Sequence, residues 1–326
     1  MRQSLITRTW GLLCLALTLL LTGCGGEPGS SFTGPTAMPD AVRAAATQGN
    51  PALVWGTLPK SWQADIDGLM HDLAKAVPAD LYDQAMVTVG KLVHVLQTKK
   101  EFVLGSPLVK AGMAELTPSQ QAQVGTVYDD VVAFGVAFSS SCVQTTDRLA
   151  RASVGDLLQE FGPQAWTAVV AVARFQSTTP GYEGRDAKEA LVFFEALKNL
   201  SATIVSQTDT SAVIAVSMPG LPERQQQQFD REMGNLAMVP IDGRWVPAKM
   251  SSTWAEPISE AKAGIAMLAS QFSPDNPQAQ QGIMMVQMGL GMFDKMLDDM
   301  AKATTQAQFD QALGGMAALM SGMGGF

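Results

Sequence analysis

The chain has 326 residues, 47% of them hydrophobic, and its 30 Asp and Glu outnumber its 22 Lys and Arg to give a net charge of −8. A chain of this length and apolar content can bury a substantial core, which excludes a wholly disordered protein. Since no basic cluster offsets the negative charge, repulsion from phosphate excludes nucleic acid as the expected partner.

The start of the chain carries a targeting pattern. Arg2 and Arg8 provide positive charge, and the run from Trp10 to Leu21 is apolar. At about 12 residues this run is shorter than the roughly 20 that a membrane-spanning helix needs, and it is typical of a secretory signal peptide. The run ends in a motif of small residues followed by a cysteine: Leu21, Thr22, Gly23 and Cys24.

This motif resembles the lipobox of bacterial lipoprotein precursors. In that family the chain is cut before the cysteine, whose thiol and amine then receive acyl chains such as palmitate. The resemblance implies that residues 1–23 are a signal peptide and that the lipid on Cys24 anchors the protein to a membrane of the cell envelope. Residue 25 is Gly rather than Asp, which by resemblance to enterobacterial members implies the outer membrane, with the protein facing the periplasm. An unlipidated secretory signal and an uncleaved anchor are the alternatives.

The remaining chain is predicted to form one domain behind a linker. Residues 24–39 comprise the lipidated cysteine and a stretch rich in Gly, Ser, Thr and Pro, which predicts a flexible tether. Residues 40–326 are predicted to form a single helix-rich domain. Cys14 leaves with the signal peptide and Cys24 carries the lipid, so Cys142 is the only cysteine left and no internal disulfide is expected.

From residue 40 to about residue 200 the apolar residues follow a helical period. The first clear lines are Trp62, Ile66, Leu69 and Leu73, and then Leu81, Ala85, Val89, Leu92 and Leu96. Thr117, Pro118 and Gln120 have the form of a capping box that opens a helix reaching about residue 138. Further helices are predicted over residues 145–161, 164–175 and 186–200.

The pattern then changes to short β-branched runs. Residues 202–206 and 212–216 predict one hairpin, and residues 238–241 and 244–250 predict a second around Asp242 and Gly243. Pro240 and Pro247 cannot donate to a ladder, so their strands are predicted to be edges or bulged. Helices are predicted at 223–233, 257–271, 277–303 and 306–320.

These elements predict an α+β fold that is predominantly helical. We expect a body resembling a helical bundle, with a small antiparallel sheet of two hairpins inserted near residues 202–250.

Methionine recurs every four residues late in the chain, at Met284, Met288, Met292, Met296 and Met300. We expect these flexible side chains to fill a core. One alternative is a pliable apolar groove for an acyl chain or an unfolded peptide, lined by Met284, Met288, Met292 and Met296. A second alternative is Cu(I) binding through the thioethers. The groove is favoured over copper because this helix contains no His or Cys.

Few side chains are candidates for catalysis. His71 and His94 are the only histidines and fall on separate predicted helices, and Asp67 is placed one turn before His71 where it could orient the imidazole. We interpret both histidines as structural and Cys142 as an inert buried thiol.

The sequence contains no HExxH, GxSxG, CxxC or phosphate-loop motif. We therefore predict no cofactor, no metal site and no catalytic residue. The predicted function is a non-enzymatic envelope lipoprotein that binds or scaffolds an envelope protein or an apolar ligand. The alternatives are an envelope hydrolase that acts through carboxylates and a methionine-rich protein that handles Cu(I).

Overall fold

A computed structural model describes residues 32–178, 185–273 and 277–323. The predicted signal peptide, the lipobox and Cys24 lie outside these residues. Within them the chain is mostly helical and contains one small antiparallel sheet, which confirms the predicted α+β fold.

Between residues 37 and 197 every regular element of the described chain is a helix. These helices are α2 (Ala37–Gln48), α3 (Ala52–Trp55), α4 (Lys60–Ala76), α5 (Ala79–Thr98), α6 (Lys100–Gly105), α7 (Pro107–Met113), α8 (Pro118–Ser140), the short 3-10 helix η1 (Cys142–Gln144), α9 (Thr146–Leu149), α10 (Val154–Glu160), α11 (Gly162–Thr178) and α12 (Arg185–Leu197). The helices that follow are α13 (Glu223–Met233), α14 (Ala248–Thr253), α15 (Ala255–Gln271), α16 (Pro277–Lys302) and α17 (Gln306–Met323).

The sheet contains four antiparallel strands in the order β1-β2-β3-β4. They are β1 (Ser201–Gln207), β2 (Ala212–Ser217), β3 (Asn235–Ile241) and β4 (Arg244–Pro247). Both predicted hairpins are confirmed, and the second turns at Asp242 and Gly243, whose φ angles of 49° and 74° fit a tight hairpin turn.

The two prolines behave differently in the second hairpin. Pro247 closes the edge strand β4, as predicted. Pro240 belongs to the inner strand β3, but it lies beyond Met238, the last residue of β3 that pairs with β2. The predicted strand continuation to Met250 is wrong, because the chain enters α14 directly after Pro247, a residue that suits a helix start better than a ladder.

The predicted helix over residues 145–161 is also wrong in part, since it is split into α9 and α10. Ser153 caps α10 through a capping box with Asp156. The carbonyl of Ala152 accepts a hydrogen bond from Nε2 of His71 at 2.8 Å, and Asp67 accepts one from the amide of Val154 at 2.7 Å. These contacts hold the chain against α4 and turn it out of a continuous helix. The capping box predicted at Thr117 and Gln120 is confirmed at the start of α8.

The folded body begins earlier than predicted. Helix α2 starts at Ala37, inside the stretch assigned to the tether, and Pro35, Ala37 and Pro39 are buried. Small apolar residues of this stretch pack against the body instead of remaining in solvent. The last residues of the stretch predicted as a tether, up to residue 39, therefore belong to the folded body.

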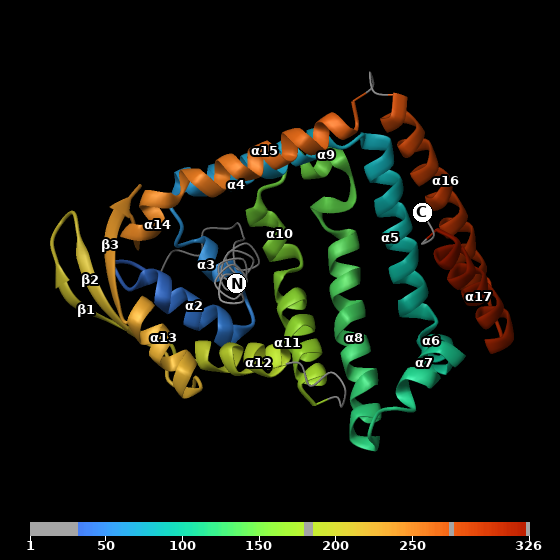
Figure 1. Ribbon diagram of the computed structural model, residues 1–326, viewed down its shortest axis with the longest axis horizontal. Coiled ribbons are helices and arrows are strands. Elements are labelled where there is room, and N and C mark those ends of the chain that lie inside the picture. The colour runs from blue at the N-terminus through green and yellow to red at the C-terminus, as the bar shows by residue number, and fades with distance from the viewer. Residues whose placement is uncertain (1–31, 179–184, 274–276, 324–326) are drawn as a thin grey trace, which may run out of the picture.

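Figure 1 shows α11, α8 and α5 side by side across the middle of the molecule, with α16 next to α5. The sheet lies at one end with α2, α12 and α13, and α16 lies at the other end with α17. Helices α4 and α15 run together along one long side. The central helices are therefore neighbours within one layer.

The buried apolar residues form several separate clusters, as this layout requires. One cluster joins the sheet to α2, α11 and α12 and contains the fully buried Met218 and Met238. A second surrounds Trp62 and Val246, where α4 meets β4. Another surrounds Leu297, where α16 meets α5 and α17. Each cluster lies at the junction of neighbouring elements.

We predict that Gly135→Val lowers the free energy of unfolding by about 1–3 kcal/mol. A β-carbon at Gly135 of α8 would lie 3.0 Å from Cγ2 of Val93 on α5, so a larger side chain would push these helices apart. Urea denaturation followed by circular dichroism measures the effect. The matched control is Gly90→Val on α5, where a β-carbon meets no atom within 4 Å, and it should stay within about 0.5 kcal/mol of wild type. Equal losses in both variants would contradict the prediction.

A candidate apolar binding hollow

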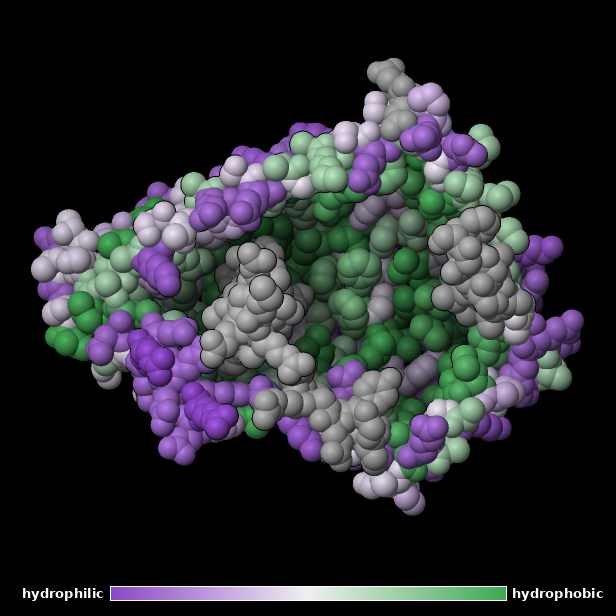
Figure 2. All heavy atoms as spheres, in the orientation of Figure 1, coloured by the Kyte–Doolittle hydropathy of each residue, from purple (hydrophilic) through white to green (hydrophobic). Residues whose placement is uncertain are grey.

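The broad face drawn in Figure 2 is hollowed in the middle. In the same orientation as Figure 1, α5, α8 and α11 form the floor, and the atoms over them are mostly hydrophobic. Helices α4 and α15 bound the hollow on one side, and the two ends of the molecule bound it on the others. From the helical spacing we infer that three rows of apolar residues face this floor, and we define the apolar hollow by these rows: Ala85, Val89, Leu92 and Leu96 on α5, Val124, Val127, Val131, Phe134 and Phe138 on α8, and Ala165, Val169 and Val172 on α11.

The row on α5 is the apolar line that the sequence predicts for this helix. Leu81 at its start is buried, but Ala85, Val89, Leu92 and Leu96 are only half-buried. The opposite side of the helix carries Val87 and His94, which are exposed. A helix face that would normally enter a core therefore remains partly open to the hollow.

Helix α8 carries apolar residues on a further face besides the two flanks that contact its neighbours. Its neighbours α5 and α11 cover its two flanks. The row from Val124 to Phe138 follows spacings of three and four, so its members share one further face, and Val131 is 40% exposed there. The opposite face carries the exposed Asp129 and Ser140. We infer from this spacing that the apolar row is the face that α8 turns toward the hollow.

Helix α11 continues the floor. Val169 is 46% exposed, and Ala165 and Val172 flank it on the same face. On the other side of the helix Thr167 and Arg174 are exposed. All three floor helices therefore turn an apolar face to the hollow and a more polar face to the outside.

Specific contacts hold α8 against α5 along what we call the α5–α8 seam. The hydroxyl of Tyr128 donates to the carbonyl of Leu96 at 2.6 Å, and Gly135 allows close approach to Val93. Lys100 forms an ion pair with Asp129 at 2.7 Å. Burial, and secondarily the charge of Asp129, raises the pKa of Tyr128 to about 12, so the phenol keeps its proton at neutral pH.

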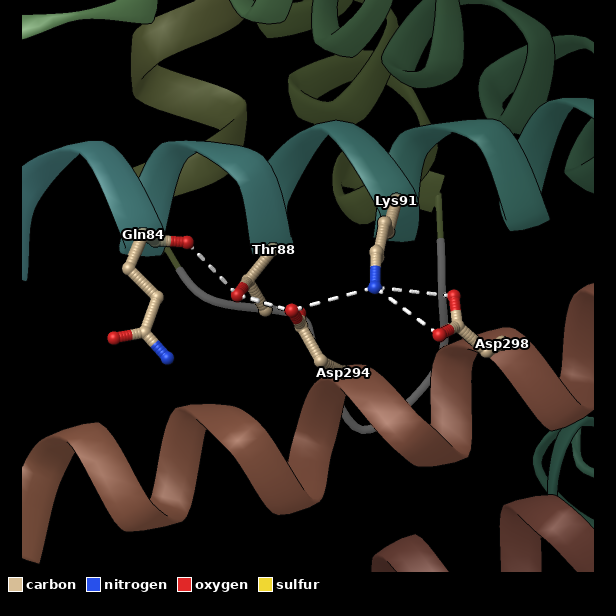
Figure 3. A network of polar contacts seen from close by, with 5 residues as sticks. All are labelled: Gln84, Thr88, Lys91, Asp294 and Asp298. Atoms are coloured by element: carbon tan, nitrogen blue, oxygen red, sulfur yellow. Dashed lines mark hydrogen bonds and ion pairs between the residues drawn. The ribbon is translucent and has the colours of Figure 1, made fainter.

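A polar network attaches the end wall of the hollow to its floor, as Figure 3 shows. Lys91 on α5 pairs with Asp294 at 3.3 Å and with Asp298 at 3.1 Å on α16. The hydroxyl of Thr88 donates to the other oxygen of Asp294 at 2.7 Å. The hydrogen bond to Asp298 is the main cause of a raised pKa of Lys91, so the lysine stays charged. The network fixes the rotation of α16 relative to α5.

The prediction that the recurrent methionines fill a core is wrong for most of them. Met284, Met288 and Met292 are 69%, 64% and 44% exposed, whereas Met300 is buried as predicted. Met296 lines a surface pocket of about 500 Å³ between α16 and α17. The physical reason is the rotation of α16, which turns its other sides toward α5 and α17. The alternative, in which Met284, Met288, Met292 and Met296 line a groove for an apolar ligand, stays a prediction.

Of the candidate residues, Asp67 and His71 lie close together on α4, and burial raises the pKa of Asp67 more than the charge interaction with His71 lowers it. His71 donates to the backbone carbonyl of Ala152, and His94 lies exposed on α5. Asp67 also accepts a hydrogen bond from the amide of Val154. Among the residues described, no group of three or more His, Cys, Asp or Glu side chains could hold a metal ion. His71 and Asp67 shape the α9–α10 turn.

Sequence reasoning found one of the three floor rows and missed the other two. A signal for the α8 row was present, because Val124, Val127, Val131, Phe134 and Phe138 keep helical spacing beside the further apolar residues of the same helix. An apolar stripe wider than one face indicates that the helix packs against more than one neighbour.

Comparisons with known proteins assign the chain to no family. No protein-family model, curated protein or solved structure matches the chain. Within residues 32–178, 185–273 and 277–323, none of the helices is both long and apolar enough to cross a membrane.

We predict that Cys142 reacts slowly with iodoacetamide at pH 8. Burial, and then the neighbouring Glu160 carboxylate, raises the pKa of the thiol to about 12, so the reactive thiolate is scarce below that pH. Mass spectrometry should show labelling at least about 100-fold slower than for a cysteine peptide, and Glu160→Gln should speed it. Val87→Cys supplies an exposed internal control. Labelling of Cys142 as fast as this control would contradict the prediction.

Proposed function

We propose that this protein is a lipid-anchored lipoprotein of the bacterial cell envelope and that it binds the acyl chain of a lipid in the apolar hollow without catalysing a reaction. The observation that carries the proposal is the floor of the hollow, where three neighbouring helices leave apolar rows partly open. Concave apolar surfaces of this kind are the usual setting of ligand sites.

The chemistry of the rows favours a hydrocarbon ligand. Their twelve members are Ala, Val, Leu and Phe, so the floor itself carries no charge and no side-chain hydrogen-bonding group. Each methylene that leaves water contributes about 0.8 kcal/mol, and an acyl chain gains this repeatedly along its length. A charged or strongly polar ligand would lose its hydration there without compensating partners. The polar residues around the rim suit a lipid head group better than the floor does.

The anchor proposal rests on the lipobox and on its distance from the folded body. Cys24 precedes Phe32, the first described residue, by eight positions, so an extended linker spans at most about 28 Å. Acyl chains on Cys24 would then keep the domain close to the membrane surface. One chain binds only marginally, whereas two or three make attachment durable. A hollow that takes lipid acyl chains would be supplied from that same membrane.

The acyl-binding proposal predicts that a carboxylate in the floor weakens binding. We expect the chain from residue 25 onward, which keeps every described residue, to bind a dansyl-labelled fatty acid. Val131→Asp and Val169→Asp should each weaken this binding about tenfold or more, because the new charge is desolvated by the bound chain. Val87→Asp is the matched control, since Val87 is 56% exposed on the opposite side of α5. Fluorescence titration measures all four proteins, and equal affinities would contradict the proposal.

The anchor proposal predicts that Cys24→Ser abolishes membrane attachment. In a bacterial host, the wild-type chain should fractionate with membranes and yield an acylated N-terminal peptide that begins at Cys24 in mass spectrometry. The variant should lose both the acyl mass and the cut before residue 24. An unmodified N-terminus in the wild type would contradict the anchor without bearing on the hollow.

A further inference from the structure

The floor of the hollow has two unlike ends. At one end the start of α8 lies beside the ends of α5 and α11, because Tyr128 donates to the carbonyl of Leu96 and the side-chain amide of Gln120 donates to the carbonyl of Thr178. At the other end α8 leads into η1 and then to α10, which contacts α4. Figure 1 shows the first end at the margin of the molecule and the second beside the long helix α4. We call them the margin end and the wall end.

Three phenylalanine rings pack against one another at the wall end. The ring centroids of Phe138 and Phe161 are 5.3 Å apart, and the Phe134 centroid is 5.9 Å from each of the other two. Phe134 and Phe138 end the apolar row of α8, and Phe161 lies between α10 and α11. We call these three side chains the aromatic stop. They are half-buried, whereas Val131, one turn before Phe134, is 40% exposed, so the α8 row is more open at Val131 than at the stop.

Buried residues support the aromatic stop from behind. Phe161 packs against Ala52 and Leu158, which are 8% and 7% exposed. Phe138 packs against the cluster that contains Met70 on α4. Edge-to-face contacts also fix the angles between the rings, because the positive edge of one ring meets the negative face of another. The stop is therefore a fixed surface, and a ligand could displace it only by opening these contacts.

Polar groups lie near the margin end instead. Lys100 donates to the carbonyl of Gly125, the residue after Val124, and forms an ion pair with Asp129. The side chain of Gln120 lies one turn before Val124. A lipid head group at this end can keep hydrogen-bonding partners, whereas the aromatic stop offers it none.

We infer that the bound acyl chain lies lengthwise along α8, with its head group at the margin end and its terminal methyl group against the aromatic stop. The stop then sets the longest chain that the hollow accommodates. This inference rests on the proposed acyl-chain binding. Val124 and Phe134 are ten residues apart, or about 15 Å along the helix. Each methylene placed between them leaves water, whereas a longer chain must bend back or remain hydrated.

Chain-length dependence tests the role of the stop. The chain from residue 25 onward is loaded with a dansyl-labelled fatty acid, which saturated fatty acids from decanoic to eicosanoic acid then displace. Wild-type affinity should rise about fourfold with each added carbon and should stop rising at one limiting length. Phe161→Ala should move this limit by at least about two carbons, because the space of the lost ring admits them. The first chain that is too long for wild type should then bind the variant about tenfold more tightly.

The matched control is Phe102→Ala. Phe102 also belongs to an aromatic pair, with Phe309 at 5.9 Å, but this pair joins α6 to α17 outside the rows of the hollow. The control should keep the wild-type limit, and circular dichroism checks that each variant is folded. Phe161→Leu should move the limit in the same direction as Phe161→Ala and replaces it if that variant does not fold. An equal limit in wild type and the folded Phe161 variant overturns the inference. Failure of every fatty acid to bind contradicts the acyl-binding proposal itself, and the inference with it.

A second measurement tests the direction of the chain. Palmitic acid brominated at its terminal carbon should quench the added fluorescence of Phe161→Trp more than palmitic acid brominated beside its carboxyl group does. Val124→Trp should show the opposite order, with the wild-type fluorescence subtracted in both cases. The same order in both variants, or the reverse of the expected order, overturns the inference.

Discussion

The α5–α8 seam determines the shape of the molecule. Tyr128 bonds the carbonyl of Leu96 at one level of the seam, and Gly135 lets the helices approach at another. Such close contact along the flanks aligns the helices edge to edge, with α11 continuing the layer beyond α8. In this arrangement each central helix buries its flanks, and much of its inner face stays uncovered. Phe134 and Phe138 of α8 are the exception, because both pack against Phe161. The separate small clusters of buried residues follow from that constraint.

A layer of helices with this geometry is amphipathic as a unit. The inner faces carry the rows that include Leu92, Val131 and Val169, and the outer faces carry His94, Asp129 and Arg174. Apolar surface left partly exposed costs free energy unless something covers it. A hydrocarbon ligand offsets this cost without requiring polar partners in the floor, which is why the proposed function is binding and not catalysis. The contacts of His71 and Asp67, which shape a turn, agree with that view.

The two apolar surfaces differ in how they are built. The hollow is concave and shared by three helices, whereas Met284, Met288 and Met292 are exposed on one side of α16. The ion pairs of Lys91 with Asp294 and Asp298 set the rotation of α16 and so determine which side of this helix is exposed. The floor of the hollow carries no charge in a chain whose net charge is −8, so the proposed binding depends on apolar transfer and not on electrostatic steering.

The sequence by itself determined most of the longer helices and the two hairpins, the Asp242–Gly243 turn, the capping box at Thr117 and the apolar line on α5, because these follow from local spacing and turn chemistry. It also carries the lipobox motif, whose lipidation stays a prediction. Only the tertiary structure decided that the α5 line is half-open, that Met284 and Met288 are exposed, and that α9 and α10 are separate. Helical periodicity identifies an apolar face but not what covers it, since the cover comes from elements distant in the chain. The rotation of α16 and the turn at Ala152 each depend on such distant partners, Lys91 and His71.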